Sequence, residues 1–210
     1  ETSTETTTNA EAASNQQTSE QATAPTERSS RRVRRSVTDT STELWVDGTN
    51  GDDANDGSSA SALKSLSKAL ELQTANPTIT TIYLKGNLSL SSTVTIPSGV
   101  TLNIASDGAT VTGSGNSIDG IVLASGATLT GTGTLTMSGF KTALTAQAGS
   151  TITDGNYVFK NNAGESGSCG ISLAGTVKGS TNKNSVTITA DDKSNTDFYE
   201  SGITFENATL

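Results

Sequence analysis

Histidine is absent from this chain of 210 residues, and arginine is absent from most of it. All five arginines lie within residues 28–35, so the rest of the chain has no guanidinium group for two-point binding of a carboxylate or phosphate. It also has no imidazole to serve as a general base at neutral pH. These two absences disfavour catalysis in the region that follows the arginine cluster.

Cysteine and apolar residues are also scarce. The single cysteine, Cys169, permits no intramolecular disulfide. Hydrophobic residues make up 31% of the chain and aromatic residues 4%, whereas ordinary globular domains are roughly 45–50% apolar. A thick core is therefore excluded, but a thin core of stacked short strands is feasible. No apolar run approaches the roughly 18 residues of a membrane span, and the net charge of -8 disfavours binding to nucleic acid.

The first 43 residues are of low complexity, with Thr, Ser, Glu, Gln and Ala dominant. Such a segment has too little apolar surface to offset its ordering entropy, so residues 1–43 are predicted to be a disordered tail. Ser/Thr-rich tails of this kind carry O-linked sugar on cell-surface stalks. The sequence RSSRRVRRSV near its end is a protease site, a polyanion contact or a solvated charge cluster in a linker.

Order is predicted to begin at Leu44, followed by a segment dense in turn-forming residues. A helix is predicted over Ser61–Ala75, capped by Ser61 or Ser59 and ended by the Asn-Pro pair at 76–77. Its apolar stripe consists of Leu63, Leu66, Ala69 and Leu70. Because the helix comes just before the first turn of stacked strands, we expect it to cover the open end of their core.

From Ile79 onward, short runs of alternating apolar and polar residues predict strands of three to five residues. A small residue followed by glycine precedes several of these runs at intervals of 23 to 27 residues. The glycines are Gly99, Gly126, Gly149, Gly175 and Gly202. This period is too short for a propeller blade and the units contain no helix. The sequence therefore predicts an all-β fold, a right-handed parallel β-helix over residues 44–210, with further turns expected beyond Leu210.

The segment WVDGTNGDDANDGSSASALKSLSKAL resembles the start of pectate-lyase-like β-helix domains, in which a strand and a loop rich in Asp, Asn and Gly precede a capping helix. Together with the Thr/Ser-rich tail and the RRVRR cluster, it resembles the N-terminal part of Gram-positive cell-wall adhesins. The nearest type is the serine-rich repeat adhesin of lactobacilli. The resemblance implies binding to host or matrix glycans and a secreted, cell-wall-associated location.

Six oxygen-bearing side chains stand close together after the first predicted strand. They are Asp47, Asn50, Asp52, Asp53, Asn55 and Asp56. Calcium takes 6–8 oxygen ligands, so this segment is a candidate calcium site, although its spacing departs from the EF-hand pattern. The alternative is that these side chains form Asx-turns and backbone caps.

Candidate ligand contacts lie on a later strand. Alternation places Tyr157 and Phe159 on one face of this strand and Lys160 on the other. An aromatic ring and a lysine suit an acidic sugar, so Tyr157, Lys160 and the nearby Lys141 are candidate ligand-binding residues. The alternative is that they occupy ordinary core and surface positions.

These observations favour a monomeric, non-catalytic adhesin module that binds host or matrix glycans, including acidic polysaccharide, or glycoproteins. Calcium is the only cofactor under consideration. A polysaccharide lyase or hydrolase of the same fold, with a lysine as base, is the second hypothesis. A passive stalk is the third.

Overall fold

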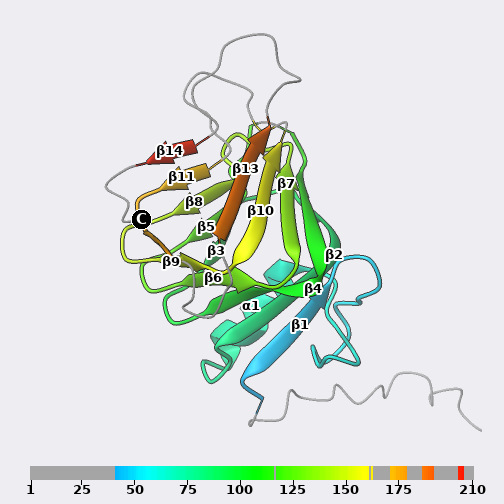
Figure 1. The fold of residues 1–210 in the computed structure, drawn as a ribbon. Helices are drawn as coiled ribbons and strands as arrows, with labels where there is room; N and C mark the ends of the chain where they lie inside the picture. The colour runs from blue at the N-terminus through cyan, green and yellow to red at the C-terminus, as the bar shows by residue number, and fades with distance from the viewer. Residues whose placement is uncertain are drawn as a thin grey trace, which may run out of the picture. The chain divides into compact units, whose positions relative to one another are not determined.

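The computed structural model describes residues 41–115, 117–160, 162, 171–178, 186–191 and 203–205. In this part of the chain, strands dominate and there is one helix (Figure 1). In chain order the elements are β1 (Glu43–Asp47), α1 (Leu66–Ala75), β2 (Thr81–Leu90), β3 (Val94–Ile96), β4 (Thr101–Gly113), β5 (Ile121–Leu123), β6 (Thr128–Gly131), β7 (Thr134–Ser138), β8 (Leu144–Ala146), β9 (Thr151–Thr153), β10 (Gly155–Lys160), β11 (Ile171–Leu173), β12 (Thr176–Lys178), β13 (Val186–Asp191) and β14 (Ile203–Phe205). The predicted tail lies outside the described residues except for its last three.

The strands stack in parallel as the turns of a solenoid with three faces (Figure 1). The first face consists of the strands β6, β9 and β12, together with residues 81–84 of β2 and residues 101–104 of β4. The second face consists of the strands β7, β10 and β13, together with residues 86–90 of β2 and residues 109–113 of β4. The third consists of β3, β5, β8, β11 and β14. Each segment pairs with its equivalent one turn later, so the predicted parallel β-helix is confirmed.

The core is a set of apolar columns that run along the solenoid. On the first face, the inward residues of successive turns are paired in register. They are Ile82, Leu102, Leu129, Ile152 and Val177, all of them buried. Because side chains alternate along a strand, the residues between them face outward. A chain with few apolar residues can therefore still build a continuous core.

Helix α1 begins five residues later than the sequence predicts. Its N-cap is Ser65, whose hydroxyl accepts a hydrogen bond from the Lys68 N–H at 3.1 Å. The predicted caps, Ser61 and Ser59, are wrong because residues 58–61 form a tight turn and Leu63 then pairs with Val46 of β1. The predicted end at Ala75 is confirmed.

The segment before α1 protects the outer edge of β1. The backbone of Leu63 donates to the Trp45 carbonyl at 2.9 Å and accepts from the Asp47 N–H at 2.8 Å. Leu66 and Ala69 of α1 are buried in the same core as the strands. Helix and extended segment together cover the N-terminal end of the solenoid, which would otherwise expose an unpaired strand edge.

The repeated glycines mark the corner between the third and first faces. Gly99, Gly126 and Gly149 have φ angles of 78°, 82° and 85°, a conformation that glycine adopts at little cost. Gly175 likewise precedes a strand of the first face, β12. The step to Gly202 is wrong, because β14, the strand that follows this glycine, pairs with β11 on the third face. In the sequence, a small residue followed by glycine therefore precedes strands of two different faces, so the glycine spacing does not identify the face.

Candidate functional site

The corner between the first and second faces is irregular in the early turns. Leu84 pairs with Ile104 and Gly86 pairs with Ala109, so one residue of β2, Lys85, stands opposite residues 105–108 of β4. The longer segment of β4 projects at the corner, while the strands on either side of it stay in register. We call residues 105–108 the corner bulge.

Glycines allow the corner bulge to pack against its neighbours. Gly108 has a φ angle of 75°, and a Cβ atom at this position would lie 2.9 Å from the carbonyl oxygen of Thr134. In the next turn, a Cβ atom at Gly133 would overlap the carbonyl oxygen of Ala105. The backbone just before β7 therefore approaches the corner bulge too closely for any other residue at position 133.

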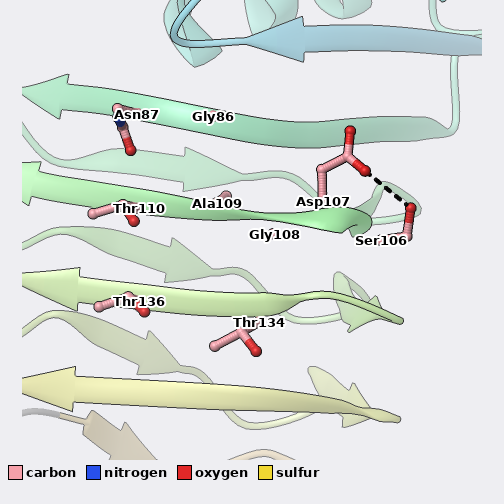
Figure 2. A pocket seen from close by; sticks show the side chains of 9 residues that line it. All are labelled: Gly86, Asn87, Ser106, Asp107, Gly108, Ala109, Thr110, Thr134 and Thr136. Carbon is pink, nitrogen blue, oxygen red and sulfur yellow. Dashed lines mark hydrogen bonds between the residues drawn. The ribbon is translucent and has the colours of Figure 1, made fainter.

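A hollow of about 330 Å³ lies on the second face beside the corner bulge (Figure 2). Its outward side chains come from strands of three successive turns, because Asn87 pairs with Thr110 and Thr110 pairs with Thr136. The full lining is Gly86, Asn87, Ser106, Asp107, Gly108, Ala109, Thr110, Thr134 and Thr136. We call this the polar hollow, since hydroxyl, amide and carboxylate groups surround it.

One rim of the polar hollow carries charge. The Asp107 side chain is 72% exposed and its Oδ2 lies 4.0 Å from Lys85 Nζ. Ser106 Oγ donates to Asp107 Oδ1 at 3.4 Å (Figure 2). The same Lys85 Nζ lies 3.5 Å from Asp47 Oδ2. Lys85 therefore joins the first turn to the corner bulge of the next.

Asp47 is 6% exposed and its carboxylate organises the turn after β1. Oδ1 accepts hydrogen bonds from the N–H groups of Thr49 and Asn50 at 2.9 and 3.0 Å. Burial on its own raises the pKa of Asp47, but these hydrogen bonds and the charge of Lys85 outweigh it and hold the pKa below its ordinary value. The ionised form is thus part of the folded structure.

The other candidate calcium ligands also bond to the backbone. Asp53 Oδ1 accepts from the N–H groups of Lys64 and Ser65 at 2.9 and 2.8 Å, which ties the loop to the start of α1. Asp52 accepts from the Ala54 N–H and Asp56 from the Ser58 N–H. The Asn55 amide donates to the Ala62 carbonyl at 2.9 Å.

This arrangement matches the alternative of Asx-turns and caps. Within the described ranges, no three acidic, cysteine or histidine side chains converge as metal ligands do. Asn50, the sixth candidate, donates from Nδ2 to Asp47 Oδ2 at 3.3 Å. Calcium binding at this loop stays a hypothesis, to be tested by the chelation experiment described below.

The three candidate ligand contacts occupy different environments. Tyr157 is 1% exposed, and its hydroxyl lies 3.0 Å from the carbonyl oxygens of Thr153 and Asp154. Burial raises the pKa of Tyr157, and the charge of Asp154 adds to this shift. The expectation that Tyr157 contacts a surface ligand is therefore wrong: the alternation is as predicted, but the aromatic face points inward. Lys160 is exposed at the end of β10, and Lys141 is half-buried at the corner after β7.

A second hollow, of about 490 Å³, adjoins the first. It is lined by Gly48, Asp53, Lys64, Ser65, Leu66, Ser67, Asn87, Leu88, Ser89, Leu90, Ser91 and Ser92. β1 pairs only with residues 81–85 of β2, so residues 86–90 have no strand beside them on that edge among the described residues. We call this space the edge hollow.

The residues that line the polar hollow were not among the candidate site residues predicted from the sequence. A signal was present at Asp107-Gly108, a turn-forming pair inside an otherwise alternating run. That pair shows where a corner lies, but the length of the bulge appears only when β4 is aligned with β2.

Comparisons with known proteins give no further information on the site, since no family, curated protein or solved structure matches this chain. In the described part of the chain, no helix is long and apolar enough to cross a membrane.

Proposed function

We propose that this protein is a secreted, surface-displayed adhesin module that binds glycans of a host or matrix, or of glycoproteins, at the polar hollow. The observation that carries the proposal is the lining of that hollow. Hydroxyl and amide groups of Asn87, Thr110 and Thr136 project from adjacent strands into one space. Such groups both donate and accept hydrogen bonds, as the hydroxyl groups of a sugar do.

The rigidity of the scaffold supports this proposal. The lining side chains stand on paired strands, so little ordering entropy is lost when a ligand binds. The Ser/Thr-rich tail and the resemblance to Gram-positive cell-wall adhesins support display of the module at the cell wall. The module is proposed to act as a monomer.

Glycan binding can be tested on an array of neutral and acidic glycans, with and without calcium. The test variant is the double substitution Asn87→Ala, Thr110→Ala. The matched control is Thr145→Ala, which removes a half-buried outward threonine from the third face. We expect the test variant to lose most binding and the control to keep it.

Two other outcomes would contradict this function. Release of unsaturated products from polygalacturonate, followed by ultraviolet absorbance, would identify a lyase. Absence of binding to every glycan by the folded chain would favour the passive stalk.

A further inference from the structure

The polar hollow and the edge hollow meet at one residue. Asn87 lines both of them, and its backbone N–H donates a hydrogen bond to the hydroxyl of Thr49 at 3.0 Å. The polar hollow extends from Asn87 towards β7, and the edge hollow extends from Asn87 towards the start of α1. Because parallel strands lie about 4.8 Å apart, a ligand spanning both would run across the strands, along the axis of the solenoid.

The edge hollow exists because β1 is short. β1 ends at Asp47, opposite Lys85, and Gly48 and Thr49 then bond to β2 only through the Lys85 carbonyl and the Asn87 N–H. Ser89 follows Asn87 at a spacing of two, so its backbone groups face the same edge as those of Asn87. The backbone N–H and carbonyl of Ser89 therefore face this edge, beside the side chains of Ser89 and Ser67.

The charge of the lining selects among glycans. In the polar hollow the one charged lining residue is Asp107. In the edge hollow, Asp53 and Lys64 contribute opposite charges. No arginine follows residue 35, and the chain carries a net charge of -8. A uronate or sialate carboxylate would meet Asp107, and the nearest cation, Lys85, is already shared between Asp107 and Asp47.

We infer that the two hollows form one binding groove for an extended, neutral glycan of several sugar units, which lies along the solenoid axis and crosses Asn87. This inference rests on the proposed glycan-binding function and assigns its ligand class. It differs from the expectation of an acidic polysaccharide, which depended on Tyr157 and the lysines.

The experiment measures the affinity of the full chain for soluble mannan, galactan, glucan and polygalacturonate by calorimetry. The neutral polymer that binds is then replaced by its oligosaccharides of increasing length. Asn87→Ala is expected to weaken binding about tenfold, the effect of roughly one lost hydrogen bond to a ligand. Thr136→Ala and Ser89→Ala probe the two ends, and Thr145→Ala is the control.

Both end variants should weaken the affinity for long oligosaccharides, whereas only one of them should weaken the affinity for short oligosaccharides. Asp107→Asn should strengthen binding to polygalacturonate, because it removes the carboxylate that faces the groove. Circular dichroism verifies that each variant is folded.

Four results would overturn the inference. A higher affinity of the unmodified chain for polygalacturonate than for the neutral polymers would contradict a neutral glycan as the ligand. Sensitivity to Thr136→Ala without any sensitivity to Ser89→Ala would confine the ligand to the polar hollow. Neutral glycan binding that Asn87→Ala leaves unchanged would place the site elsewhere while keeping the proposed function. Failure to bind any glycan would remove the proposed function as well.

Discussion

Asn162 reaches back across one turn of the solenoid to hold the corner after β7. Its Oδ1 accepts a hydrogen bond from the backbone N–H of Phe140 at 3.2 Å, and its Nδ2 donates to the Met137 carbonyl at 2.9 Å. The side chain is fully buried. The amide thus satisfies two backbone groups that the strands leave unpaired.

Replacement of Asn162 by alanine should destabilise the fold by about 1–3 kcal/mol, because two buried backbone groups lose their partner. Urea unfolding followed by circular dichroism measures this change. Asn162→Asp is the matched variant: it keeps the acceptor but loses the donor to Met137, so it should also be destabilised. A change below about 0.5 kcal/mol in both variants, the size typical of surface substitutions, would contradict a structural role.

Leu129 tests the apolar columns. It is fully buried between Leu102 and Ile152, so Leu129→Ala should cost about 2–5 kcal/mol. Thr130→Ala, next to it on the outward face, serves as the control and should change stability by less than about 0.5 kcal/mol. Similar losses for the two variants would mean that the faces are assigned wrongly.

Asp47 should make stability depend on pH. Its folded-state pKa lies below the ordinary value of 3.8, so its ionised form stabilises the folded chain above that pH. The contribution is lost as the pH falls from 3.8 through the lower folded-state value. Unfolding measured over this acid range should show a steeper loss for the unmodified chain than for Asp47→Asn. Parallel curves would show that Asp47 is not the group that titrates.

Chelation tests the calcium hypothesis. The carboxylates of Asp47, Asp52, Asp53 and Asp56 already accept backbone N–H groups. We therefore expect the melting temperature to be the same in EDTA and in millimolar calcium. A melting temperature that rises with calcium concentration would instead reveal binding to the folded state.

Gly133→Ala probes the packing of the corner bulge. The added Cβ would overlap the Ala105 carbonyl, so the variant should be less stable and its polar hollow should bind the glycan more weakly. Gly115→Ala is the control, since a Cβ at position 115 meets no atom within 4 Å, although its φ of 150° adds some strain. Equal stability of the two variants would contradict the close approach.

Alternation along short segments was sufficient to predict the strands, since a two-residue period sorts side chains to opposite faces whatever their neighbours. The spacing of 23 to 27 residues between the glycines then predicted the parallel stacking. It could not decide which face of β10 is buried: Tyr157 and Lys160 both suit a surface. The start of α1 could not be predicted from the sequence either, because Leu63 fits the apolar stripe of a helix as well as it fits an extended segment. Leu63 is extended because it pairs with the otherwise free edge of β1.

The candidate site depended on register between turns rather than on any local pattern. Asn87, Thr110 and Thr136 are separated by more than twenty residues along the chain, and only strand pairing brings them together. No motif links them in the sequence.

The corner bulge has a consequence for how such a protein can diversify. Ile104 and Ala109 return to register with the adjacent turn although residues 105–108 stand opposite a single lysine. Insertions at this corner therefore leave the apolar columns intact, while they reshape the space beside them. Ligand preference can change by small differences in corner length, at little cost to the stability of the scaffold, and each turn can vary independently of the others.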